Sequence, residues 1–64
     1  MVTINGTQEQ AAGMSILSYL KSAGYNPQTV VVEKNLEIIP RDALETVLLE
    51  DGDSVEILRF VGGG

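Results

Sequence analysis

The sequence predicts an α+β fold in which one main helix crosses one face of a sheet. Short β-branched segments, one amphipathic segment and a final strand-like segment follow one another in the order β-β-α-β-β-(short helix)-β. A chain of 64 residues holds one core at most, because domains of this size bury only about 60% of the surface that the unfolded chain exposes. We therefore expect a single domain over residues 1–60, followed by a flexible glycine tail over residues 61–64.

The first two strands are predicted to form a hairpin. Val2 and Ile4 share one face of an alternating segment, and Asn5-Gly6 follows directly. Both turn residues tolerate positive φ, which makes this dipeptide the strongest short hairpin signal. Residues 7–10 would return as a short polar edge strand.

The main helix is predicted to begin after Ser15 and to be about ten residues long. The Ser15 hydroxyl can cap the first turn, and Gly24 can close the helix in the left-handed conformation. Tyr19 and Tyr25 are expected at the edges of this helix. Its apolar stripe consists of Ile16, Leu17, Leu20 and Ala23.

Two further strands and a crossover are predicted next. Residues 29–33 form a continuous β-branched run that suits a buried strand, and residues 34–35 indicate a turn. Residues 36–39 would form a short strand that Pro40 ends, because proline cannot donate a ladder hydrogen bond. Residues 41–49 have weaker helical spacing and indicate a short helix or an irregular crossover.

Asp51-Gly52-Asp53 is interpreted as the turn before the last strand. Two carboxylates around one glycine lack the further oxygen ligands that calcium needs, so no metal site is expected. Turn chemistry explains the pair better, since aspartate bonds the nearby backbone and glycine takes positive φ. Contact with a partner is the second interpretation.

The last strand, residues 54–60, is predicted to have one buried and one exposed face. Val55 and Ile57 would lie under the helix, which leaves Leu58 and Phe60 on the open side of the sheet. An exposed apolar pair near the C-terminus is typical of a docking surface, unless the crossover covers it. Arg41 would contact a partner or form a solvated ion pair.

Composition excludes several classes of function. The chain has no cysteine and no histidine, which excludes disulfides, thiolate or imidazole zinc sites and Ser-His or Cys-His nucleophilic pairs. Nine acidic and four basic residues give a net charge of −5, the opposite of what nucleic acid attracts. That charge would favour a basic partner surface and make association slower as ionic strength rises. With no apolar segment of roughly 20 residues and no signal-peptide pattern, we expect a cytoplasmic protein that does not enter membranes.

Three glycines end the sequence. Without Cβ atoms, Gly62 and Gly63 could thread a narrow cleft, so that the carboxylate of Gly64 reaches the α-phosphate of a nucleotide. An acyl-adenylate formed there has a good leaving group, which a sulfur or amine nucleophile can displace. The alternative is an inert, solvated end.

Several features follow one another along the chain: Asn5-Gly6, Gly13, Ser15, Asn35 through Arg41, Asp51-Gly52-Asp53 and Gly63-Gly64. With these features in this order, the whole chain resembles the ThiS family, the sulfur carrier proteins of thiamine biosynthesis, which have the ubiquitin-like β-grasp fold. That resemblance implies a mixed sheet of four to five strands, with the last strand parallel beside the first and a short second helix. Gly62 is a departure, since family members often have a small or apolar residue there.

The resemblance implies a carrier and co-substrate that is not itself an enzyme and binds no cofactor. A ThiF-type, ubiquitin-activating-like adenylating enzyme would use ATP and Mg²⁺ to adenylate Gly64. A cysteine desulfurase system would supply sulfur for a thiocarboxylate, which a ThiG-type thiazole synthase would consume. We expect a monomer when the chain is alone. A MoaD-like carrier for the molybdenum or tungsten cofactor, a carrier for another thio-metabolite, a ubiquitin-like protein modifier and a plain scaffold remain alternatives.

Overall fold

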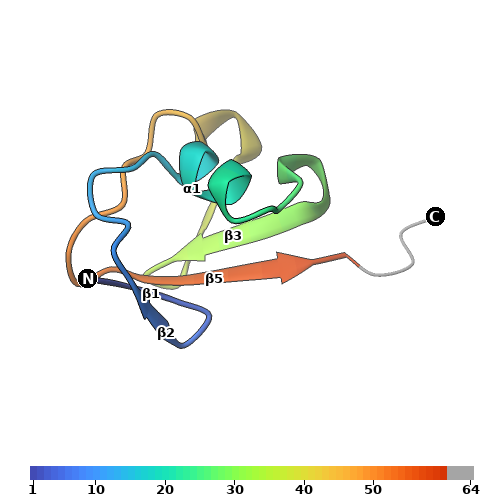
Figure 1. Ribbon diagram of the computed structural model, residues 1–64. Coiled ribbons are helices and arrows are strands. Elements are labelled where there is room, and N and C mark those ends of the chain that lie inside the picture. The colour runs from blue at the N-terminus through green and yellow to red at the C-terminus, as the bar shows by residue number, and fades with distance from the viewer. Residues whose placement is uncertain (61–64) are drawn as a thin grey trace.

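A computed structural model describes residues 1–60 and has the predicted α+β architecture. Five strands form one mixed sheet in the order β2-β1-β5-β3-β4, and α1 crosses one face of it (Figure 1). The predicted tail, residues 61–64, lies outside the described residues. In chain order the elements are β1 (Val2–Ile4), β2 (Thr7–Glu9), α1 (Ile16–Ser22), η1 (Pro27–Thr29), β3 (Val30–Lys34), β4 (Glu37–Ile39), η2 (Arg41–Ala43) and β5 (Ser54–Arg59).

The last strand lies parallel beside the first, as predicted. β5 pairs with β1 in parallel, with Thr3 opposite Ser54, and pairs with β3 in the antiparallel sense. β2 and β4 form the two edges, each antiparallel to its neighbour. The strand that leads to the C-terminus is therefore the central strand of the sheet.

The predicted hairpin turn is confirmed, and its asparagine has a second role. Asn5 and Gly6 have φ values of 49° and 83°, as a two-residue hairpin turn requires. The Asn5 Oδ1 accepts from the Ile57 N–H at 2.8 Å, and its Nδ2 donates to the Ile57 carbonyl at 3.3 Å. This side chain extends the pairing of β1 with β5 beyond the end of β1.

Ser15 caps α1 as predicted, with its Oγ accepting from the Ser18 N–H at 3.1 Å. The helix is seven residues long, shorter than the predicted ten, because the chain leaves helical geometry at Ala23 and Gly24 takes a φ of 85°. Ala23 is therefore exposed and not on the buried stripe. Tyr19, expected at the edge of the helix, lies in the core instead and is only 8% exposed.

The boundaries around β3 differ from the sequence prediction. β3 begins at Val30 and not at residue 29, because Pro27–Thr29 form a 3₁₀ turn capped by the Asn26 side chain. The turn between β3 and β4 is formed by Asn35 and Leu36, whose φ values are 52° and 71°. Leu36, predicted to start the next strand, is thus a left-handed turn residue and is 93% exposed.

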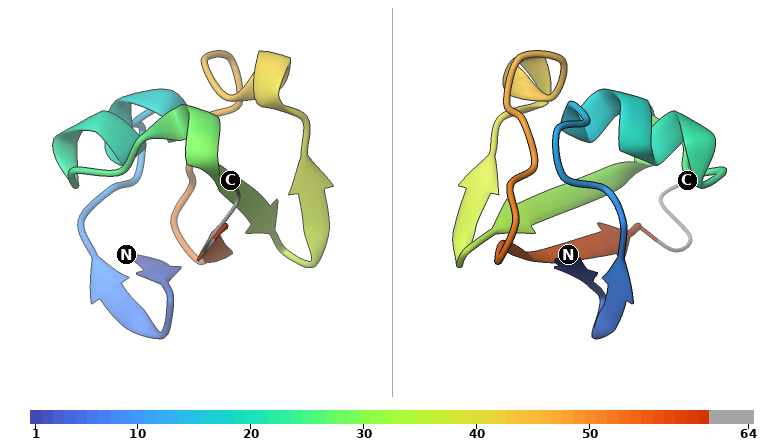
Figure 2. Two further views of the ribbon diagram at one scale, coloured as in Figure 1. Left: turned by 90° about the vertical axis from the view of Figure 1, so that its right-hand side faces the viewer. Right: turned by 60° about the vertical axis from the view of Figure 1, so that its left-hand side comes forward.

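The crossover and α1 cover the same face of the sheet (Figure 2). The predicted short second helix is the single 3₁₀ turn η2, and the rest of residues 41–49 is irregular. Leu44 and Leu49 of this segment are buried, which explains its weak helical pattern of apolar residues. The core consists of Val2, Ile4, Ala11, Ile16, Tyr19, Leu20, Val30, Val32, Leu44, Leu49, Val55 and Ile57.

Across residues 1–60, we find no helix that combines the length and the apolar character needed to traverse a bilayer.

Candidate functional site

The two faces of β5 are as the alternation predicted. Val55 and Ile57 are buried under α1, whereas Leu58 is 49% exposed and Phe60, which follows β5, is 60% exposed. The crossover lies on the same side of the sheet as α1 (Figure 2), and the exposure of Leu58 and Phe60 shows that it does not cover them. The structure therefore leaves an apolar pair on the open face, at the end of the strand that leads to the tail.

Neighbouring strands extend this apolar surface and set carboxylates beside it. Val31 of β3 lies directly opposite Leu58, and Glu33 lies directly opposite Glu56. Ile38 of β4 is paired with Glu33 and is 66% exposed. Like charges opposite each other on neighbouring strands repel, so this part of the open face is not optimised for the stability of the isolated domain.

The pairing of β5 with the sheet continues to Phe60. Its N–H donates to the Thr29 carbonyl at 3.1 Å, one step beyond the last residue of β5. The base of the predicted tail is thereby fixed beside the start of β3. Gly62, Gly63 and Gly64, the predicted threading and reactive residues, follow this point and lie outside the described residues.

Arg59, the last residue of β5, was not among the residues singled out from the sequence. Its guanidinium carbon lies 4.8 Å from the centre of the Tyr25 ring, in cation–π geometry. Tyr25 reaches this position because Gly24 redirects the chain after α1, which no local pattern indicates. The half-buried ring thus holds Arg59 at the exit of β5.

Arg41 contacts backbone atoms at the same end of the sheet. Its Nη1 donates to the Pro27 carbonyl and, at 3.4 Å, to the Val30 carbonyl. Within residues 1–60 it forms no ion pair, so the predicted solvated pair is not found there. A role in partner contact stays a prediction for Arg41, as it does for Leu58 and Phe60.

The Asp51-Gly52-Asp53 turn lies at the opposite end of β5 and is structural. Asp53 accepts from the Asn35 side chain at 3.0 Å and from the Glu50 N–H at 2.8 Å, with the Lys34 ammonium 3.6 Å away. Burial alone would raise the pKa of the Asp53 carboxyl. The bonds from Asn35 and Glu50, together with the Lys34 ammonium, outweigh burial and hold that pKa below its ordinary value.

A hollow of about 460 Å³ lies over the seam between β1 and β5. Thr3, Ser54 and Glu56 line it, and Leu58 borders it, but no basic side chain does. Nucleotide phosphates are normally held by cationic side chains or by backbone N–H groups at a helix N-terminus. This hollow offers neither, so it does not suit ATP, and the part of the chain that the structure describes gives no catalytic constellation.

Comparison with known proteins decides the family. Residues 2–64 match the ThiS family, which is nearly the whole chain and includes the terminal glycines. The chain belongs to the ThiS family. The crystal structure of the thiamine biosynthesis protein ThiS from Geobacter metallireducens is 34% identical with a TM-score of 0.78, covering 98% of this chain and 97% of that one. This likeness confirms the predicted ubiquitin-like fold.

Curated relatives of this ThiS family member are of two kinds. The sulfur carrier protein ThiS of Bacillus subtilis is 42% identical over 50 residues, which is 78% of this chain and 76% of that protein. Thiazole synthases of Paramagnetospirillum magneticum and Magnetococcus marinus are 39% and 33% identical over 64 residues, 98% of this chain. The chain spans about a fifth of the length of these two synthases (20%).

Proposed function

We propose that this chain is a sulfur carrier of thiamine biosynthesis whose terminal carboxylate, on Gly64, becomes a thiocarboxylate. The observation that carries this proposal is the ThiS family match, which extends through residue 64 and so includes the glycine tail. The described residues add a consistent feature: β5 carries its pairing out to Phe60, four residues before Gly64. The proposed carrier therefore presents a short glycine-rich segment from a fixed base.

The proposed chemistry exchanges one oxygen atom for sulfur. A carboxylate oxygen of Gly64 attacks the α-phosphorus of ATP, and pyrophosphate leaves. A hydrosulfide equivalent from a cysteine desulfurase system then attacks the acyl carbon, and AMP leaves with the original oxygen. Mg²⁺, ATP and all acid–base groups would belong to a ThiF-type adenylating enzyme, so the chain itself acts as a co-substrate.

The proposed docking surface for that enzyme is the apolar pair of Leu58 and Phe60, with Arg41 nearby. The pair is exposed and lies at the end of β5, which leads to the tail, so docking there would align the tail with a cleft. A ThiG-type thiazole synthase is the proposed acceptor of sulfur. Two thiazole synthases contain a stretch similar to this chain, which supports a link between carrier and synthase.

Intact mass spectrometry tests the chemistry. The chain is incubated with MgATP, a purified ThiF-type adenylating enzyme and a sulfide source. We expect a mass gain equal to the exchange of one oxygen for one sulfur. Deleting Gly64, or changing Gly63→Leu to block threading, should abolish the gain and leave the melting temperature unchanged.

No mass gain from the unaltered chain, with the enzyme shown to be active on another carrier, would overturn the proposal. Covalent conjugates of the chain to lysines in cells would instead favour a protein modifier. A thiocarboxylate that supports molybdopterin formation and not thiazole formation would favour a molybdenum or tungsten cofactor carrier.

A double substitution tests the docking surface. Leu58→Asp with Phe60→Asp should weaken binding to the adenylating enzyme at least tenfold, because two apolar contacts become charged, with little loss of stability. Leu36→Asp with Leu48→Asp is the matched control, since both leucines are exposed and lie away from the end of β5. Equal affinity of the two variants for the enzyme would show that Leu58 and Phe60 are not part of the interface.

A further inference from the structure

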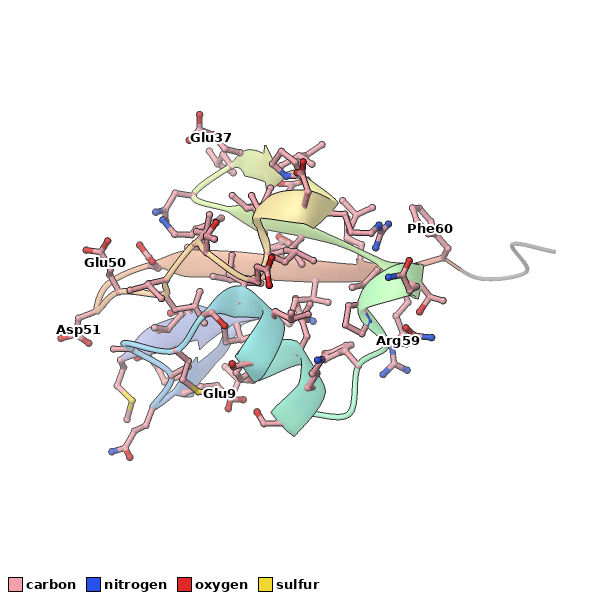
Figure 3. All side chains as sticks on the ribbon, turned by 90° about the horizontal axis from the view of Figure 1, so that it is seen from above. Glu9, Glu37, Glu50, Asp51, Arg59 and Phe60 are labelled. Atoms are coloured by element: carbon pink, nitrogen blue, oxygen red, sulfur yellow. The ribbon has the colours of Figure 1, made fainter. Side chains whose placement is uncertain are left out.

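The charged residues labelled at the two ends of the molecule in Figure 3 differ in sign. Figure 3 shows Glu37, Glu50 and Asp51 at one end of the molecule and Arg59 with Phe60 at the other. The two ion pairs found within residues 1–60 both lie at the acidic end: the N-terminal ammonium with Asp51, and Lys34 with Asp53. Two of the positive charges are thus already neutralised far from the tail.

The arginines at the tail end are held by uncharged groups instead. The Tyr25 ring supports Arg59, and the Pro27 and Val30 carbonyls support Arg41. Val30 is also the residue directly opposite Arg59 in the pairing of β3 with β5. Both guanidinium groups are therefore anchored around one position, the exit of β5.

Neither guanidinium meets a carboxylate in the part of the chain that the structure describes, although the chain has nine acidic residues. A ring and backbone carbonyls orient a guanidinium without cancelling its charge. Each arginine has five N–H donors in a planar fork, so donors that fit a carboxylate remain after the observed contacts. Because the side chains are already ordered, pairing with a carboxylate would cost less conformational entropy.

We propose that Arg59 and Arg41 form a basic collar around the exit of β5, and that the collar pairs with carboxylates at the mouth of the cleft that receives the glycine tail. This inference rests on the proposed function, since it concerns the enzyme that adenylates Gly64. The net charge of the chain does not indicate such a basic surface, nor its pairing with carboxylates.

The reach of the tail decides which anion the collar meets. Four residues beyond Phe60 span at most about 14 Å. A carboxylate of Gly64 that reaches a nucleotide therefore leaves the collar roughly that distance away, at the surface of the enzyme. The anions that pair with Arg59 and Arg41 are accordingly side-chain carboxylates of the partner and not the phosphates of ATP.

The net charge of −5 led us to expect a basic partner surface, and the collar refines that expectation. At physiological ionic strength the screening length is about 8 Å. β5, with six residues, is about 20 Å long at about 3.3 Å per residue, so its two ends act on a partner separately. Attraction at the tail end is thus set by the local arginines.

Steady-state ATP–pyrophosphate exchange by a purified ThiF-type enzyme, with the full chain as varied substrate, tests the collar. Arg59→Gln is compared with Gln10→Glu, an exposed residue that adjoins β2, on the side of the sheet where Met1 pairs with Asp51. Each substitution makes the net charge more negative by one. We expect the KM of Arg59→Gln to rise about tenfold with an unchanged kcat, and that of Gln10→Glu to change less than about twofold.

Two further variants sharpen the result. Arg59→Lys keeps the charge but loses the planar fork, and should raise KM only about threefold. The double variant Arg41→Gln with Arg59→Gln should exceed the single effect, and both effects should shrink as salt is added. Circular dichroism melting of each variant checks that the fold is retained. If Arg59→Gln is unstable, the KM of Arg59→Lys tests the proposal in its place.

The outcomes separate this inference from the proposed function. Equal KM values for Arg59→Gln and Gln10→Glu, with normal exchange by the unaltered chain, would overturn the collar and leave the carrier function intact. A lower KM for Arg59→Gln would likewise overturn it, because the enzyme surface would then be basic at that point. No exchange with the unaltered chain would contradict the proposed function itself.

Discussion

The charged residues at the two ends of β5, Asp53 and Arg59, have different surroundings. Asp53, just before the strand, accepts hydrogen bonds from the Asn35 side chain and the Glu50 N–H, and its carboxylate lies near the Lys34 ammonium. Arg59, at the other end, stacks on a single aromatic ring and meets no carboxylate within residues 1–60. Both residues are charged and next to turns or chain ends, so their types alone do not distinguish them.

Within residues 1–60, Asp53 is paired with an opposite charge and Arg59 is not, which indicates different roles for the two ends of β5. The Asp53 carboxylate closes the turn that starts β5, since its oxygens bind backbone and side-chain donors from two segments. Arg59 contributes little that the core needs, because Val55 and Ile57 already fix the strand under α1. We conclude that the first end of β5 stabilises the fold and the second is available for binding.

The largest expected effect is on stability at Asp53. Asp53→Ala should lower the free energy of unfolding by about 2 kcal/mol, because charge-assisted hydrogen bonds are lost and their donors are left without a partner. Arg59→Ala should lower it by less than about 1 kcal/mol, the usual value of an exposed cation–π contact. Urea unfolding of both variants measures the difference, and a larger loss for Arg59→Ala would reverse the comparison.

A smaller effect, of opposite sign, is expected in the turn beside Asp53. Leu36 has a φ of 71° and is 93% exposed, so its side chain adds backbone strain without burial. Leu36→Gly should raise the free energy of unfolding by about 0.5–1 kcal/mol, because glycine adopts positive φ freely. Leu36→Ala is the control that keeps the strain, and its melting temperature should stay near that of the unaltered chain. A loss of stability in Leu36→Gly would show that the leucine packs on something.

The smallest expected effect concerns pH. The folded-state pKa of Asp53 is below its unfolded value, so the carboxylate contributes stability above about pH 4 and loses it as pH falls through the folded pKa. Asp53→Asn lacks this titration. The stability difference between the unaltered chain and Asp53→Asn should therefore narrow as pH is lowered from 7 to 3 in urea unfolding. A constant difference over that range would mean that the Asp53 charge contributes nothing.

The sequence alone predicted the features that depend on local patterns. Alternation assigned Val55 and Ile57 to the core and left Leu58 exposed, and Asn5-Gly6 located the hairpin. The parallel pairing of the first and last strands followed only from the resemblance to a known family. Strand faces and tight turns are set by neighbours in sequence, which is why a single sequence sufficed for them.

The sequence did not predict contacts between segments that are far apart along the chain. The stacking of Arg59 on Tyr25 depends on how Gly24 redirects the chain after α1. The two hydrogen bonds of the Asn5 side chain to Ile57 depend on the parallel register of β1 and β5. Both contacts form only once the sheet is assembled, so neither periodicity nor composition indicates them.

The central position of β5 has a mechanical consequence. In the proposed function an enzyme draws the C-terminal segment into its cleft. That pull would act along β5, which is hydrogen-bonded to β1 on one side and to β3 on the other. The bonds on both sides then share the load in shear, whereas an edge strand such as β2 or β4 would be peeled away one bond at a time. Pairing on both sides would therefore help the domain to stay folded while the proposed enzyme pulls on its C-terminal end.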